Sequence, residues 1–233
     1  MRFFYSGVNR HGFQGYRPPG VFARVRQRPF RGRLTQRQVD GLSAILDGWG
    51  AHTGDDGAGD GRGAGSGIGT GRQELAYVLA TAFHETAATM QPVRETLART
   101  DAEAIRRLDR AFAEGRLKAV RTPYWRRDEE GKCWLGRGLV QLTHRRNYEA
   151  MSQLTGVDLL ADPGRALDMD VSVAILIGGM RRGSFTGHRL EDYFRPGRPE
   201  EPDWVGARRI INGRDRAELV AGHAREFARA LDR

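Results

Sequence analysis

Two glutamates, Glu85 and Glu95, lie on either side of Pro92. Two carboxyl groups held across a cleft are suited to breaking a glycosidic bond, because one protonates the leaving oxygen while the other activates water. On one straight helix the two Cα atoms would lie roughly 15 Å apart. Pro92 has no N–H to donate and disfavours the helical conformation at the preceding residue. We therefore expect a turn that brings Glu95 back toward the carboxyl separation of about 6.5–9.5 Å in inverting glycosidases.

The elements that must position these carboxyl groups are mostly helices. Apolar residues recur at helical spacing over residues 73–90, so Glu85 is expected on a helix. The same pattern predicts further helices at residues 35–49, 101–114, 145–154, 169–181, 203–211 and 217–231. The most apolar of these, at 169–181, is expected to be the core helix. Residues 134–143 are expected to form short extended structure.

Two segments lack such a pattern. Residues 1–21 are rich in glycine, arginine and aromatic residues and are expected to form an irregular arm. Residues 51–71 are so rich in glycine that they cannot bury enough apolar surface to offset their ordering entropy, so we expect a flexible loop. The remaining chain, residues 22–233, is expected to form one catalytic domain, since 233 residues fit a single domain.

Composition narrows the classes of protein that the chain can belong to. The net charge of +9 favours an anionic partner, such as an acidic cell-wall polymer, anionic lipid or nucleic acid, although an arginine-rich coding bias explains it equally well. No nucleic-acid-binding motif is present, so nucleic acid is not the expected partner. No apolar run approaches the roughly 20 residues of a membrane span. The first residues lack the apolar core of a secretory signal, so we expect synthesis in the cytoplasm and action after release.

Metal and disulfide chemistry are not expected. Cys133 is the only cysteine, which excludes an internal disulfide and a multi-cysteine zinc site. A zinc-protease helix that began at His84 and Glu85 would need a second histidine at position 88, where the chain has Ala88. We expect neither a metal nor another cofactor.

Four stretches in order resemble glycoside hydrolase family 19, and most of all its compact bacterial and phage endolysins. They are residues 82–86 (AFHET), 93–95 (VRE), 136–143 (GRGLVQLT) with Asn147 and Tyr148, and 209–213 (RIING). The resemblance implies a mainly α, lysozyme-like α+β fold, in which a helical bundle surrounds a core helix and a small β-hairpin or sheet lies beside the substrate cleft.

The resemblance also implies residue roles. Glu85 would be the general acid, Glu95 the general base, and Thr143 the residue that positions the attacking water. Residues at cleft or sugar-binding positions of the family would be Gln141, Asn147, Tyr148 and Asn212, with looser matches at Trp125 and Arg225. From the residues alone, Asp101 stays open as the base, and Trp125 is equally consistent with a core position.

The leading hypothesis is a peptidoglycan-degrading endolysin that hydrolyses β-1,4 bonds of the glycan strand with inversion. A chitinase that acts on N-acetylglucosamine polymers is the alternative within the same class. A non-catalytic basic protein that binds the cell wall or nucleic acid is the alternative from another class. Peptidoglycan glycan strands, or chitin-like polymers, are the expected partners, and we expect a monomer.

Overall fold

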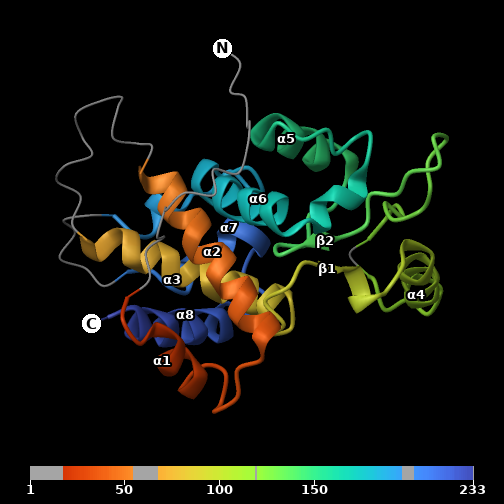
Figure 1. The fold of residues 1–233 in the computed structure, drawn as a ribbon. Coiled ribbons are helices and arrows are strands. Elements are labelled where there is room, and N and C mark those ends of the chain that lie inside the picture. Colours follow the sequence, from red (N-terminus) through yellow and green to blue (C-terminus); the bar gives the residue numbers. More distant parts are fainter. Residues whose placement is uncertain (1–17, 55–67, 119, 196–201, 233) are drawn as a thin grey trace.

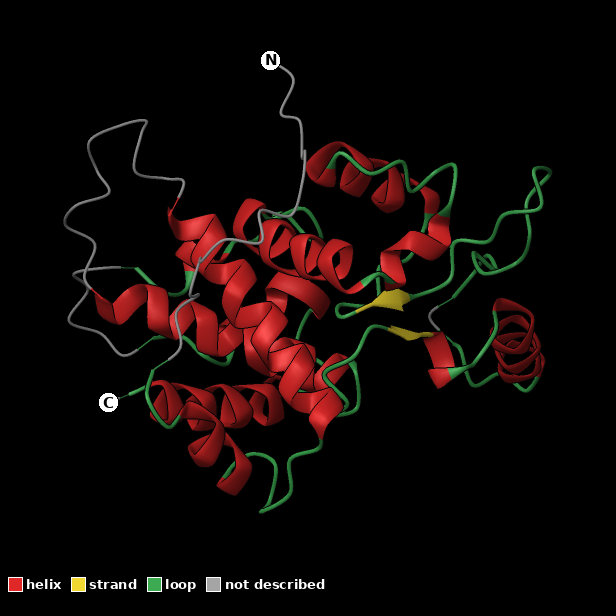
Figure 2. Ribbon diagram, viewed as in Figure 1, coloured by secondary structure: helices red, strands yellow, loops and turns green. Residues whose placement is uncertain are grey.

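The computed structural model describes residues 18–54, 68–118, 120–195 and 202–232 of the chain. Most of the predicted N-terminal arm and residues 55–67 of the glycine-rich segment lie outside these ranges. The described chain is mainly helical, with one small two-stranded antiparallel sheet (Figure 1, Figure 2), as predicted. Among these residues no helix is both long enough and apolar enough to cross a membrane.

The larger core lies between helices that are far apart in the sequence. Helix α3 (Ile68–Glu85) packs along α8 (Ala217–Leu231), and α2 (Gln36–Gly54) packs on α6 (Met169–Arg182). Most residues of α6 are buried, which confirms the predicted core helix. Helix α5 (Arg145–Thr155) covers α6, and α1 (Val21–Gln27) lies against α8 (Figure 1).

A second, smaller hydrophobic cluster lies apart from that core, around α4 (Asp101–Ala113). It contains Leu108, Trp125 and Leu135. Thr100 caps α4, because its hydroxyl accepts a hydrogen bond from the backbone of Glu103. We refer to α4 and the segments that contribute to this cluster, around residues 98, 124–125 and 133–135, as the small lobe.

The sheet joins the small lobe to the main helices (Figure 1). Strand β1 (Val93–Arg94) pairs antiparallel with β2 (Arg137–Gly138), so that Val93 faces Gly138 across the pair. The 3-10 turn η2 (Glu95–Leu97) follows β1 directly. Extended structure over 134–143 is limited to β2 and one bridge between Arg137 and Leu142, so only part of that prediction is confirmed.

The helix that carries Glu85 ends at Glu85, five residues earlier than its apolar pattern predicted. Ala87, Ala88 and Met90 have positive φ angles, which a helix cannot accommodate. Thr86 stabilises the turn, because its hydroxyl accepts a hydrogen bond from the Met90 amide at 3.0 Å. The Met90 carbonyl lies so close to the backbone of Gly41 that a side chain at residue 41 would clash with it.

Other element bounds also differ from the predictions. Helix α2 continues to Gly54 and α3 begins at Ile68, so both helices extend into the segment predicted as a loop. The predicted helix at 203–211 is a 3-10 turn, η5 (Gly206–Arg208), followed by one short helix, α7 (Arg209–Asn212). Two further 3-10 turns are η3 (Pro163–Leu167) and η4 (Leu190–Asp192). The helices at α4, α5, α6 and α8 agree with their predicted bounds to within one residue at each end.

Glu74 makes the stability of the fold depend on pH. Burial on α3 raises its pKa from 4.5 to about 7, with Arg181 opposing the shift and Glu191 adding to it. The folded state therefore binds more protons than the unfolded state between these values. This contribution to stability is fully present below pH 4.5 and is lost as the pH rises to about 7. We expect Glu74→Gln to raise the free energy of unfolding at pH 8 by roughly 1–2 kcal/mol, with little change at pH 4, in urea titrations. An equal effect at both pH values would contradict this assignment.

Candidate active site

Glu85 ends α3 in an ion pair with a buried arginine. The Nη1 atom of Arg208 donates to Oε1 of Glu85 at 2.7 Å, and the side chains are 3% and 15% exposed, respectively. The Nε atom of the same guanidinium group donates to the carbonyl oxygen of Asp215 at 2.9 Å. Arg208 therefore connects Glu85 to the loop between α7 and α8.

Glu95 is held by hydrogen bonds to both of its carboxylate oxygens. The Tyr124 hydroxyl donates to Oε1 at 2.7 Å, and the Gly136 amide donates to Oε2 at 2.8 Å. The backbone amide of Glu95 donates in turn to the Gly136 carbonyl at 2.7 Å. Burial and the charge of Glu95 raise the pKa of Tyr124 well above its usual range, so the phenol keeps its proton and remains a donor. The carboxylate is thus fixed in orientation while remaining partly accessible.

Gln141 lies next to this carboxylate across Gly136. A Cβ atom at residue 136 would lie 2.8 Å from Oε1 of Gln141 and 3.3 Å from Oε2 of Glu95. Gln141 has a φ of 54° and its amide donates to the Val93 carbonyl at 3.0 Å, so its side chain is anchored to β1. The structure therefore brings together Glu95 and one predicted sugar-binding residue.

Adding a methyl group at this position tests how closely the site is packed. We expect Gly136→Ala to lower kcat on a glycan substrate by about tenfold, because the new Cβ must displace Gln141 and the Glu95 carboxylate. Gly222→Ala is the matched control, since a Cβ there meets open space on α8. Both rates should be measured from released reducing ends. Wild-type turnover by Gly136→Ala would contradict the predicted packing.

Thr143 lies two residues after Gln141 and directly precedes His144. The Asn147 side chain donates to the Thr143 carbonyl at 2.8 Å, which fixes the backbone of the predicted water-positioning residue. The next residue, His144, has its ring centroid 4.4 Å from that of Tyr124. Burial and the charge of Arg146 lower the pKa of His144, against the opposing charge of Glu95. Thr143 is half-buried.

Asp101 has a structural role. Its carboxylate oxygens bind Arg94 at 2.7 Å and Arg137 at 2.6 Å. Burial raises the pKa of Asp101, but hydrogen bonds and charge from both arginines outweigh that effect and lower it below the usual value. A carboxylate already paired with two guanidinium groups is a poor proton acceptor, which argues against Asp101 as the base.

Burial contradicts two predicted sugar contacts. Tyr148 and Trp125 are both 0% exposed. The Tyr148 hydroxyl donates to the Leu135 carbonyl and accepts from Arg137, and the Trp125 indole donates to Asp109. Neither side chain has a free face for a sugar ring, because Trp125 is packed within the small lobe and Tyr148 within the larger core.

The remaining predicted residues lie elsewhere on the surface. Asn212 ends α7 and Arg225 lies on α8, both exposed, and their sugar-binding roles remain predictions. Arg225 was predicted from a loose resemblance to a C-terminal arginine, whereas Arg208 is the arginine that contacts Glu85. Arg208 directly precedes the stretch 209–213 that carries the resemblance, and this position was a signal in the sequence for a role at the site. Tyr124 had no such signal, because only the fold brings it to Glu95.

The two glutamates belong to separate networks. Within the described ranges, no hydrogen bond or ion pair joins the Glu85–Arg208 pair to the group formed by Glu95, Tyr124 and Gly136. No cluster of three or more histidine, cysteine or acidic side chains suited to a metal occurs there either. The arrangement supplies two carboxyl groups in different surroundings, one beside a cation and one held by neutral donors.

Comparison with known proteins identifies the fold. No protein-family model matches the chain, and no curated protein sequence does. A crystal structure of a bacterial family 19 chitinase is similar, with a TM-score of 0.53 and 20% sequence identity over 90% of this chain and 93% of the other. A mutant of chitinase C is also similar, with a TM-score of 0.51 and 18% identity over 95% of each chain. The chain therefore has the fold of family 19 chitinases, which are glycoside hydrolases.

Proposed function

We propose that the protein is a glycoside hydrolase that cleaves β-1,4 bonds in the glycan strand of peptidoglycan with inversion. The observation that carries this proposal is the pair of glutamates in contrasting environments on a chitinase fold. Residues 22–233 would act as one catalytic unit and as a monomer, at the cell wall after release. Neither a metal nor an organic cofactor is required for this chemistry.

In the proposed reaction, Glu85 gives its proton to the glycosidic oxygen as the bond from that oxygen to the anomeric carbon breaks. Water attacks the opposite face of the carbon and loses a proton to Glu95. Tyr124 and Gly136 keep the base oriented toward that water, and Thr143 helps to hold it. Arg208 favours the ionised form of Glu85, so the acid role requires this ion pair to loosen when substrate binds.

The choice of peptidoglycan over chitin rests on the endolysin-like motifs and on the net charge of +9, which attracts anionic polymers. Chitin remains the second candidate, because the two similar structures described above are chitinases. Incubating the protein with purified sacculi and with chitin oligomers separates the two. Mass spectrometry identifies the reducing ends, and NMR of the first-formed anomer identifies the stereochemistry.

We expect soluble fragments from sacculi with an initial α-anomer at the new reducing end. Faster cleavage of chitin oligomers would favour the chitinase. Salt-sensitive binding without cleavage of either polymer would support the non-catalytic alternative and reject the proposed hydrolase.

A further inference from the structure

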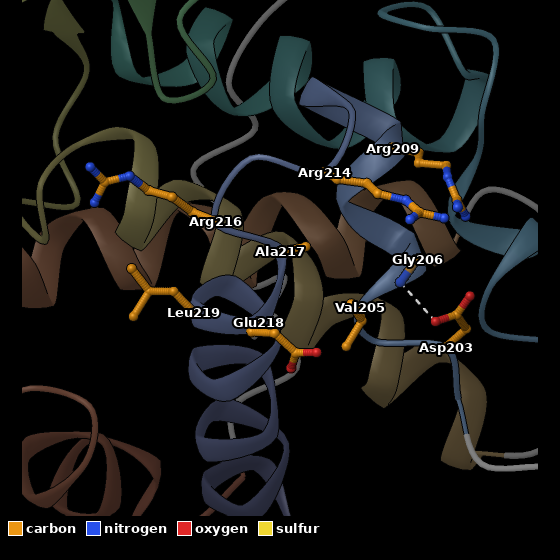
Figure 3. Close-up of a pocket in the computed structure, with 9 residues that line it drawn as sticks. All are labelled: Asp203, Val205, Gly206, Arg209, Arg214, Arg216, Ala217, Glu218 and Leu219. Atoms are coloured by element: carbon orange, nitrogen blue, oxygen red, sulfur yellow. Dashed lines mark hydrogen bonds between the residues drawn. The ribbon is translucent and has the colours of Figure 1, made fainter.

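A pocket of about 770 Å³ lies between η5, α7 and the start of α8 (Figure 3). Arg209, Arg214 and Arg216 contribute to its lining, together with the two acidic residues Asp203 and Glu218. This volume is large enough for an amino-acid-sized or sugar-sized group. We propose that the pocket binds a carboxylate of the peptide-bearing amino sugar in peptidoglycan. This inference rests on the proposed function, because it names the part of that substrate which this surface recognises.

The pocket is coupled to Glu85 through Arg208. The guanidinium group of Arg208 binds Glu85 at 2.7 Å and the Asp215 carbonyl at 2.9 Å. Asp215 lies between Arg214 and Arg216, so the loop that carries both arginines is attached to the partner of the candidate acid. A glycan bound at Glu85 therefore has this basic loop beside it.

Arg216 acts electrostatically on His84, which lies near the end of α3. Burial lowers the pKa of His84, with Arg208 and Arg216 adding to the effect and Glu85 opposing it. Figure 3 shows Arg216 extending away from Arg209 and Arg214, on the other side of the loop. The arginines thus cover two directions from which an anionic group could approach.

Two of these guanidinium groups are available for a ligand. In the described part of the chain, neither Arg214 nor Arg216 makes a side-chain hydrogen bond or ion pair, and both are exposed. Asp203 forms no ion pair with either of them, and its Oδ1 atom instead accepts a hydrogen bond from the Gly206 amide at 2.7 Å (Figure 3). Arg209, by contrast, is engaged with Tyr193. Arg214 is therefore the expected ligand contact inside the pocket, while Arg216 extends to the other side of the loop and adds positive charge on the side of His84.

The backbone holds this loop in a defined shape. Gly213 has φ 47° and ψ −118°, and Arg216 has φ 53° where α8 begins. The Thr186 hydroxyl donates to the carbonyl of Arg209 at 2.6 Å, which ties α7 to the rest of the fold. Guanidinium groups on an anchored loop lose less entropy on binding than groups on a free one.

The chemistry distinguishes peptidoglycan from chitin. The repeat of chitin is uncharged, whereas the peptide-bearing sugar of peptidoglycan carries carboxylates on its stem. A guanidinium group matches a carboxylate with two parallel hydrogen bonds. The pocket would therefore add affinity for peptidoglycan that chitin cannot gain.

Changing the charge on both the protein and the ligand tests this pocket. The probe is a fluorescent disaccharide–tetrapeptide, used with its carboxyl groups intact or converted to amides. Its binding to the Glu85→Gln protein, which prevents turnover, is measured by fluorescence anisotropy. We expect amidation to raise Kd by about tenfold, and to change it by less than about twofold once Arg214→Gln and Arg216→Gln are added.

Arg106→Gln and Arg229→Gln, added together to the same background, are the matched control for net charge. They remove two exposed arginines, one on α4 and one elsewhere on α8, and should keep the full effect of amidation. A tenfold effect that persists in the double-arginine variant, or no effect of amidation at all, overturns the proposal. Cleavage of sacculi by the wild-type protein is scored separately. Arginine-dependent binding without cleavage would retain the pocket and reject only the proposed hydrolase.

Discussion

Glu85→Gln is expected to lower kcat on peptidoglycan by roughly 10³-fold, with little change in KM. Glutamine has no acidic proton for the glycosidic oxygen, so the alkoxide would have to leave unassisted. In the wild-type protein Arg208 donates to Oε1 of Glu85 at 2.7 Å. The amide oxygen of glutamine can accept the same hydrogen bond, so the fold should be preserved. Reducing-end release gives the rate, and thermal unfolding checks the fold.

The leaving group provides a sharper test of this role. An aryl glycoside with an acidic phenol needs little protonation, so Glu85→Gln should recover most of its activity on such a substrate. Glu149→Gln, at an exposed position on α5, is the matched control and should behave as wild type. If Glu85→Gln retained more than about a tenth of wild-type activity on peptidoglycan, Glu85 would not be the general acid.

Glu95→Gln is expected to cause a loss of similar size, about 10³-fold in kcat, for a different reason. Both oxygens of Glu95 accept hydrogen bonds, from Tyr124 and from the Gly136 amide. A glutamine NH2 group would face one of these donors, so the variant loses the base and also one of its two anchors. Tyr124→Phe removes an anchor alone and should cost only about tenfold.

Rescue of activity by added azide distinguishes the role of Glu95 as the base from that of Glu85 as the acid. Azide is already ionised and needs no base, so it should restore part of the rate of Glu95→Gln while leaving Glu85→Gln inactive on peptidoglycan. Rescue of both variants, or of neither, would contradict the assigned roles.

Asp101→Asn tests whether Asp101, the alternative to Glu95, is the general base. Arg137, which is 1% exposed, would lose its charged partner, and we expect a loss of about 3 kcal/mol in unfolding free energy. The folded fraction should keep its kcat. A loss of kcat without a loss of stability would instead favour Asp101 as the base.

The pattern of apolar residues was sufficient to predict much of the fold. Helices α4, α5, α6 and α8 follow directly from helical spacing, and α6 is the core helix because most of its residues are apolar. These features depend on local sequence, where the position of a side chain on a helix follows from residue number. The two glutamates were likewise identifiable as a candidate pair, because Pro92 disfavours a continuous helix between them.

The surroundings of those glutamates depend on tertiary structure. The Glu85–Arg208 ion pair joins residues 123 positions apart, and the Tyr124–Glu95 hydrogen bond joins residues 29 apart. Spacing in the sequence does not reveal such contacts, because they depend on which faces of α3, η5 and the small lobe meet. For the same reason the sequence did not reveal that Tyr148, predicted as a sugar contact, and Trp125, predicted as either a sugar contact or a core residue, are both buried.

The sequence by itself therefore determined the helical framework, the basic charge and the presence of two carboxyl groups that are candidates for glycoside hydrolysis. Tertiary structure alone decided which cation pairs with Glu85, which donors hold Glu95, and that Asp101 is committed to two arginines. The physical reason is that apolar periodicity is a local property, whereas the charge and hydrogen bonding around a carboxylate are set by residues that only folding brings close.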